Sequence, residues 1–341
     1  MKNDNKKSSA FLNLFSGYGG VLIVLILFIV LFSLVTKTFF RKDNLILVLR
    51  QACTSGIMAA GVTCVLTAGS INLGLGAIYG LSAMTAALAM TRAGVPIALG
   101  LILSLVIGCL LGAACGLIIT KTGIPAFIAT LGVQYIARGL TYIISGGTTA
   151  TLMNDPLNQI GIGSLFGIPY PIFYMIFVMI ILYIVMNRTK VGRYISATGS
   201  NSVAARFAGI NTDKMIMLVH MIAGLLAGLS GFVNNARTFA ATPTAGEGTE
   251  IDAIAAVVIG GTSMAGGKGT LIGTAIGCLV IAVMGNGLNH IGLNSYYQMV
   301  LKGVLIIIAV GIDGVKKRAE IAAQMKKAAQ EAAAELAASQ N

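Results

Sequence analysis

The sequence has few charged residues, few prolines and no tryptophan. Only 10% of its 341 residues are Asp, Glu, Lys or Arg, whereas soluble domains contain about 25%, and 56% are hydrophobic. A water-soluble fold cannot bury this much apolar side chain, which excludes a soluble domain and predicts an all-α protein with several membrane spans. Proline is scarce at 6 residues, but the 43 glycines suit helices that pack closely in lipid.

The residues needed for catalysis or metal binding are also sparse. The chain has 2 histidines and 11 acidic residues, and its 5 cysteines lie in apolar runs without a Cys-x-x-Cys pair. No Ser-His-Asp, His-Glu-x-x-His or paired-carboxylate pattern is present, so we expect neither an enzyme nor a metal site. The glycine-rich run 261–270 is not a phosphate loop, because Gly267 occupies the lysine position. The chain itself is therefore expected to bind no cofactor; any ATP and magnesium would be used by a partner.

The net charge of +12 could indicate nucleic-acid binding, but the cations lie in short loops and at the two chain ends, which is typical of membrane topology. We expect about ten membrane helices with short glycine-rich breaks. Fifteen Lys and Arg residues fall on one set of connecting segments and six on the other, which predicts that both termini are cytoplasmic. The chain then divides into a cytoplasmic tail 1–18, a membrane domain 19–315 and a cytoplasmic tail 316–341. The expected spans lie near residues 19–36, 45–68, 73–91, 95–119, 124–145, 169–187, 214–236, 252–265, 270–291 and 296–315.

Residues 188–214 form the one long basic segment inside the chain, with five cations and one carboxylate. A short helix is expected from Asn201 to Phe207, ending before Gly209. We interpret this segment as a cytoplasmic docking element for a soluble partner. The alternative is an ordinary basic loop that only obeys the topology rule.

Polar residues within spans are candidates for a transport pathway, because they are costly in lipid. Phe127, Thr130, Gln134 and Arg138 recur at helical spacing in the fifth span and form one polar stripe. The stripe favours either a cavity lining or an arginine that reaches the outer headgroups, and the sequence does not decide between them. Lys302, near the outer end of the last expected span, is expected to reach the outer headgroups. His220 is expected to be a neutral residue at a helix interface.

Four blocks in order resemble the permease subunits of ribose-type monosaccharide ABC importers, over roughly residues 45–315. They are Ile124–Gly132 with Ile136–Leu140, the docking segment Gly192–Ile210, the run Glu250–Ser263, and Tyr297–Gln298 with Lys302–Gly303. The chain departs from the family pattern at Asn72, which replaces an acidic residue, at Gly74, which replaces a serine, and at Ala126, which replaces a proline. These departures put the pathway role of position 72 in question.

The resemblance implies a ten-helix permease that works as a homodimer in a bacterial-type cytoplasmic membrane. It also implies two ABC ATPase subunits and an extracytoplasmic sugar-binding protein as partners. It assigns ATPase coupling to the docking segment. The residues expected on the pathway are the asparagine of the break before the third span and the stripe of the fifth span, and two acidic residues near the start of the eighth span are expected on the binding-protein side. In that order, the residues are Gly192, Arg193, Gly199, Asn201, Ala204, Ala205, Arg206 and Gly209; Asn72, Phe127, Thr130, Gln134 and Arg138; and Glu250 and Asp252.

The main alternative is a secondary carrier or facilitator that works without an ATPase. Few acidic residues lie in the middle of the expected spans, which disfavours coupling to protons or sodium but leaves simple facilitation open.

Overall fold

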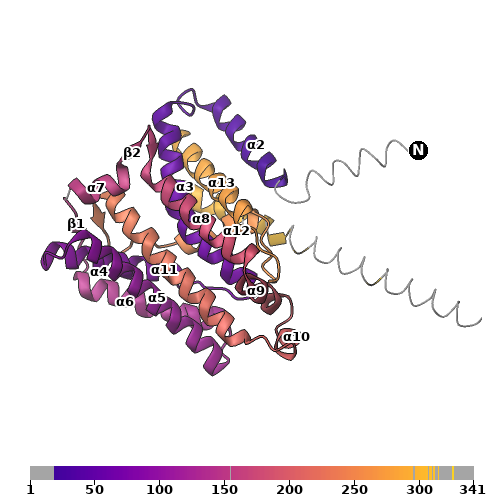
Figure 1. Ribbon diagram of the computed structural model, residues 1–341. Helices are drawn as coiled ribbons and strands as arrows, with labels where there is room; N and C mark the ends of the chain where they lie inside the picture. The colour runs from indigo at the N-terminus through magenta and orange to yellow at the C-terminus, as the bar shows by residue number, and fades with distance from the viewer. Residues whose placement is uncertain are drawn as a thin grey trace, which may run out of the picture.

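The computed structural model describes residues 19–153, 155–294 and 296–305, with residues 307, 308, 310, 311, 314 and 325. The predicted tail 1–18, and the predicted tail 316–341 apart from Met325, lie outside the described residues. The described chain is mostly helical, which confirms the predicted all-α class (Figure 1). The division into a membrane domain and two tails stays a prediction.

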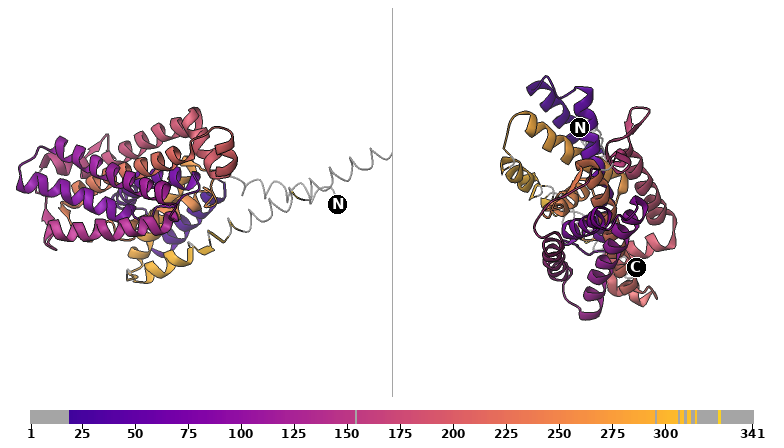
Figure 2. Two further views of the ribbon diagram at one scale, coloured as in Figure 1. Left: turned by 90° about the horizontal axis from the view of Figure 1, so that it is seen from below. Right: turned by 90° about the vertical axis from the view of Figure 1, so that its left-hand side faces the viewer.

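The helices lie roughly parallel and form one bundle (Figures 1 and 2). At one end of the bundle are α9 and α10, and we call it the α10 end. At the other end are α7 and the short strands, and we call it the α7 end. The helices are α2 (Gly19–Val35), α3 (Lys42–Thr67), α4 (Leu75–Arg92), α5 (Ile97–Thr122), α6 (Ala126–Ser145), α7 (Asp155–Ile162), α8 (Tyr170–Arg188), α9 (Lys190–Ser200), α10 (Ser202–Phe207), α11 (Thr212–Thr238), α12 (Thr249–Ile259) and α13 (Leu271–His290). Residues 296–305 are also helical.

Four two-residue strands lie near the α7 end. β1 (Ala150–Thr151) pairs antiparallel with β4 (Ala240–Ala241), and β2 (Ser164–Leu165) pairs antiparallel with β3 (Ile168–Pro169). The β1–β4 pair joins the chain after α6 to the chain after α11, so it fixes where the segment leading to α12 begins.

Six described helices are long and apolar enough to cross a membrane: α3, α5, α6, α8, α11 and α13. α2 is apolar but has only 17 residues. The predicted span 252–265 is wrong in its extent, because α12 ends at Ile259 and has 11 residues, about half of the 20 that a span requires. Glycines at positions 260 and 261 follow it, and Gly261 has a φ of +90°, which ends the helix. The number of ten spans stays a prediction.

The most extensive contact between two helices of the described chain is that of α5 with α11 (Figure 1). Small residues recur every four positions on α5, where a Cβ added to Gly108 or Gly112 would collide with a backbone carbonyl of α11. The hydroxyl of Ser104 donates to the carbonyl oxygen of Gly228 across the same contact, at 2.9 Å. Small residues let membrane helices approach backbone to backbone and so gain van der Waals contact without a hydrophobic driving force.

We predict that Gly112→Leu destabilises the protein, because the added side chain would meet the carbonyl of His220 on α11. Overpacking of this kind costs about 1–3 kcal/mol or more. The measurement is the thermal unfolding midpoint of the purified protein in detergent. Gly132→Leu is the matched control, since Gly132 is exposed on α6 and a Cβ there meets nothing within 4 Å. Equal midpoints for the two variants would contradict the packing role.

Candidate coupling and translocation sites

The predicted docking segment folds as two short helices, α9 and α10, at one end of the bundle (Figure 1). The side chain of Asn201 starts α10, since its Oδ1 accepts hydrogen bonds from the amides of Val203 and Ala204 at 3.1 and 3.0 Å. Gly209 ends it with a φ of +83°, and the amide of Ile210 donates back to the carbonyl of Ala205. The predicted short helix and both of its end signals are confirmed.

α10 presents an apolar pair to the outside. Val203 and Phe207 lie one turn apart, and their side chains are 61% and 89% exposed. Ala204 is also exposed, whereas Ala205 is buried against the chain. An exposed aromatic side chain next to small residues is typical of a surface that fits into a partner's groove. The coupling role of these residues stays a prediction.

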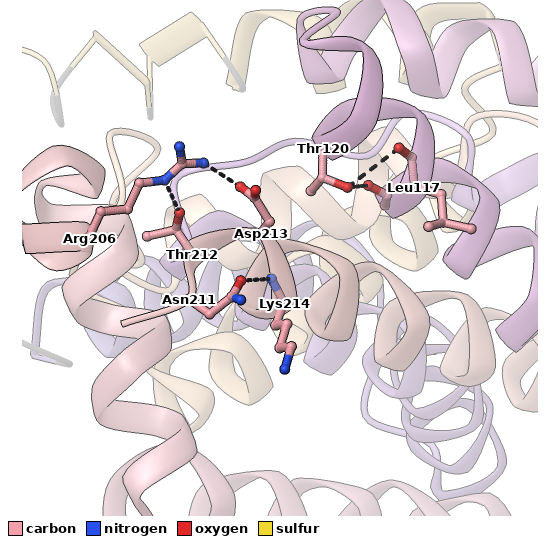
Figure 3. Close-up of polar contacts among 8 residues, drawn as sticks. Leu117, Thr120, Arg206, Asn211, Thr212, Asp213 and Lys214 are labelled. Atoms are coloured by element: carbon pink, nitrogen blue, oxygen red, sulfur yellow. Dashed lines mark hydrogen bonds and ion pairs between the residues drawn. The ribbon is translucent and has the colours of Figure 1, made fainter. Parts of the chain in front are cut away.

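Arg206 is engaged within its own chain. Its guanidinium donates to the hydroxyl of Thr212 at 2.6 Å and forms an ion pair with Asp213 (Figure 3). Asn211 caps α11 beside this pair by accepting from the amide of Lys214 at 2.9 Å. These contacts attach α10 to the first turn of α11. Of the two predicted coupling arginines, Arg193 is exposed on α9, and no ion pair joins it to another described residue.

α9 is joined to the core through backbone contacts between glycines. A Cβ on Gly199 would collide with the carbonyl oxygen of Thr67, and one on Gly266 would lie 2.6 Å from the carbonyl oxygen of Gly199. The amide of Gly267 donates to the same Thr67 carbonyl at 2.9 Å. The C-terminal ends of α3 and α9 and the turn between α12 and α13 therefore meet at one point, where backbone lies against backbone and the small side chains of Thr67 and Ser200 face glycines.

The chain between α3 and α4 is non-helical and lies inside the bundle. Both ends of the Asn72 amide are used there, since Oδ1 accepts from the amide of Gly74 and Nδ2 donates to Nδ1 of His220, each at 2.9 Å. Nε2 of His220 lies 2.9 Å from the hydroxyl of Ser70. Because Asn72 presents a donor, Nδ1 of His220 is the acceptor and Nε2 carries the proton. His220 is thus neutral and lies at a helix interface, as predicted.

α6 contributes Thr130 to this non-helical stretch. Its hydroxyl accepts from the amide of Leu73 at 3.1 Å and is completely buried. Gln134 and Arg138 are half-buried on the same helix, whereas Phe127 is 49% exposed. The predicted polar stripe is therefore divided: its threonine supports the chain before α4, and its phenylalanine lies on an outer surface. Whether any of these residues lines the pathway stays a prediction.

Arg138 bonds to backbone carbonyls rather than reaching the bundle end. Its Nη1 donates to the carbonyls of Pro243 and Ala245, at 2.9 and 2.8 Å. Both carbonyls belong to the non-helical stretch that leads from β4 into α12. The arginine therefore satisfies backbone groups inside the bundle, a role that neither interpretation from the sequence included.

The two acidic residues of α12 have different surroundings. Glu250 is buried, 5% exposed, and its Oε2 has no hydrogen-bond partner among the described residues. Asp252 forms an ion pair with Lys302 of the last described helix at 2.7 Å, so Lys302 does not extend freely toward the headgroups as expected. Contact of Glu250 with a binding protein would require that carboxylate to become exposed, and both predicted roles stay predictions.

Residues outside the predicted site set, mostly glycines and a serine, also shape these sites. Gly76 and Gly80 of α4 receive the backbone of the stretch before α12, and Ser70 positions His220. The four-residue spacing of the two glycines is a signal for close packing, but it does not identify what packs there.

Comparison with known proteins decides the family. A family model described as the permease component of a branched-chain amino acid transport system matches residues 44–310. The chain belongs to this permease family. The ribose import permease protein of Escherichia coli (strain K12) is 40% identical over 302 residues, which cover 87% of this chain and 93% of that protein.

Further relatives of this permease extend the range of sugars. The ribose import permease protein of Bacillus subtilis (strain 168) is 40% identical over 86% of this chain and 92% of its own length. The D-allose transport system permease protein of Escherichia coli (strain K12) is 36% identical over 90% of this chain and 94% of its own. No solved structure shows a significant match.

We predict that Asn201→Ala loosens α10 of this permease without unfolding the bundle. Loss of an N-cap costs about 0.5–2 kcal/mol, and here it removes the acceptor for two amides. Hydrogen exchange at Val203 and Ala204 should accelerate about 3-fold to 30-fold, while the α5–α11 contact keeps its protection. Asn201→Ser, which retains a capping oxygen, should exchange nearly as slowly as the unchanged protein. Equally fast exchange in both variants would contradict the cap.

Proposed function

We propose that this chain is the membrane-spanning permease subunit of an ATP-driven importer for a monosaccharide, ribose or a related sugar. Substrate reaches it from an extracytoplasmic binding protein, and a cytoplasmic ATPase supplies the energy. The ribose and allose permeases that match over nearly their whole length support the sugar class. ATP and magnesium are bound by the partner, and this chain acts as a transport subunit that catalyses no reaction.

The observation that carries the proposal is the way α10 is built. An exposed apolar pair lies on a capped helix, and Arg206 attaches that helix to α11. Its neighbour α9 contacts α3 and the α12–α13 turn through close backbone contacts at glycines. A push on Phe207 is thereby passed to three segments of the core. In our mechanism, ATP binding and hydrolysis in the partner move α9 and α10, and the bundle changes between outward-open and inward-open states.

The proposed assembly is a homodimer of this permease with two ATPase subunits. The bundle would cross a bacterial-type cytoplasmic membrane ten times, counting α12 with the non-helical stretch before it as one span and the helix from residue 296 onward as the last. The α10 end then faces the cytoplasm, as do both termini. The positive-inside count from the sequence supports this orientation.

We predict that Phe207→Asp reduces binding of the ATPase subunit at least about 10-fold, because the charge would have to be buried in the partner's groove. The measurements are co-purification of the ATPase and sugar-stimulated ATP hydrolysis in vesicles. Met153→Asp is the matched control, since Met153 is also 89% exposed but lies in the chain between β1 and α7. Normal coupling in the Phe207 variant would contradict the docking role. Sugar uptake by the permease alone in liposomes would favour the facilitator instead.

The orientation is tested by thiol labelling of intact cells. Cysteine introduced at Met153 should react with a membrane-impermeant reagent added outside, whereas cysteine at Ser200 should react only after the membrane is opened. The native cysteines give little background, since four are buried and Cys109 is half-buried. Labelling of position 200 from outside would overturn the topology and the ATPase docking together.

A further inference from the structure

The chain between β4 and α12, residues 242–248, runs inward along α4, and we call it the β4–α12 segment. Its contact with α4 is backbone against backbone. A Cβ on Gly80 would lie 2.6 Å from the carbonyl oxygen of Ala245, and a Cβ on Gly76 would collide with the carbonyl oxygen of Gly246. The two glycines are one turn apart and form a groove that receives the backbone of the segment, and the ring of Tyr79 borders Gly246. A segment held mainly by backbone contacts can leave the groove with little rearrangement of side chains.

Two positive-φ glycines border the end of this segment. Gly246 has a φ of +83° and Gly248 one of +74°, and α12 begins directly after them. Residues with side chains rarely adopt this conformation, whereas glycine moves between it and others at little cost. The β4–α12 segment can therefore rotate about these glycines while α12 stays in place.

Arg138 holds the segment in the groove. Among the described residues, its only hydrogen bonds are those from Nη1 to the carbonyls of Pro243 and Ala245. A Cβ on Gly80 would lie 3.2 Å from the same nitrogen, so the guanidinium stands directly beside the groove. Carbonyl oxygens are weaker partners for arginine than a carboxylate, with which it forms two charge-assisted bonds.

A carboxylate without a full set of partners lies one turn away. Oε2 of Glu250 packs against Gly76 and accepts no hydrogen bond from any residue that the structure describes, although it is buried. Gly76 and Gly80 are separated by about 6 Å along the helix, and Glu250 and Arg138 attract each other electrostatically. A buried acceptor without a donor is rare in native structures and calls for an explanation.

We propose that Arg138 exchanges between these two sets of partners and that the exchange opens the pathway at the β4–α12 segment. In the arrangement described here, Arg138 binds the Pro243 and Ala245 carbonyls and the segment lies in the α4 groove. In the second arrangement, Arg138 pairs with Glu250, the two carbonyls turn to water, and the segment leaves the groove. Each arrangement leaves some polar groups without protein partners, so neither satisfies every group, and a ligand or partner that favours one shifts the population toward it. Arg138 is thus a positioning residue, and Glu250 is its alternative partner.

The inference rests on the proposed function, because ATP-driven movement of the bundle is what would select between the two arrangements. It is tested with a cysteine at Ala245 in the complete complex of permease, ATPase and binding protein in vesicles. A membrane-impermeant thiol reagent is added on the side of the binding protein. The labelling rate is measured at rest and during ATP hydrolysis with ribose present.

Arg138→Gln should raise the resting rate about 10-fold, because the segment loses its donor. Glu250→Gln should leave the labelling rate of the Ala245 cysteine low both at rest and during ATP hydrolysis. The reason is that the alternative partner of Arg138 has lost its charge. Arg138→Lys, which keeps the charge but loses the planar fork, should fall between Arg138→Gln and the unchanged residue. Arg92→Gln is the control, since within the described part of the chain the one polar contact of this exposed α4 arginine is a long one to the Ile144 carbonyl, at 3.5 Å.

A merely structural role predicts that both Arg138→Gln and Glu250→Gln raise the resting rate, and that result would overturn the proposal. Unchanged labelling in Arg138→Gln would also overturn it. The resting rates require no ATP, so they test the exchange even if ribose fails to stimulate hydrolysis in the unchanged complex. That last result would count against the proposed function instead.

Discussion

The structure depends on one constraint: backbone that leaves helical geometry inside a membrane must still have partners for its N–H and C=O groups. Two stretches of this chain face that demand, one before α4 and one before α12. The first is supported by uncharged side chains, Asn72, Thr130 and, through Asn72, His220. The second is supported by Arg138. The difference matters because a neutral amide has no strong competing partner, whereas a guanidinium beside a carboxylate does.

The close contact between α5 and α11 makes the first of these supports possible. Small residues on α5 let α11 approach until backbones touch, and α11 carries His220 to the chain before α4. The same helix begins at the cap of Asn211, beside the ion pair of Arg206. A displacement of α10 would therefore reach the N-terminal end of α11 first. α11 connects that end to the residues that stabilise the chain before α4.

The sequence predicted the elements whose signals are local. Asn201 and Gly209 mark the ends of α10 because a cap and a positive-φ glycine act within a few residues, and the long apolar helices follow from composition in the same way. The order of the family blocks gave the permease class, which comparison confirmed. The extent of α12 was mispredicted, because the small residues that follow Gly260 contain no charge and were counted with the span, whereas Gly261 adopts a positive φ and ends the helix.

The contacts within the candidate sites could not be predicted, because they join residues that are far apart in the sequence. Glu250 packs on Gly76, and Arg138 bonds to Ala245; no periodicity or spacing encodes either pair. The ion pair of Arg206 is an exception in range, since Asp213 is 7 residues away in the sequence. The resemblance assigns Arg206 to ATPase coupling, and only the fold shows that Asp213 lies within reach. Local signals thus locate the elements, while the chemistry of the sites depends on how the helices pack.

Asn72 shows how a departure from the family pattern fits its new surroundings. Its amide offers one acceptor and one donor, and the structure uses both, toward the amide of Gly74 and toward Nδ1 of His220. A carboxylate at this position could still accept from Gly74 but would have nothing to donate to the histidine. The ring would then have to carry a proton on Nδ1, and Ser70 would have to donate to Nε2 in place of accepting. The asparagine and the Nε2-protonated histidine are therefore matched as a neutral pair, and a buried neutral pair leaves no charge next to the start of α4.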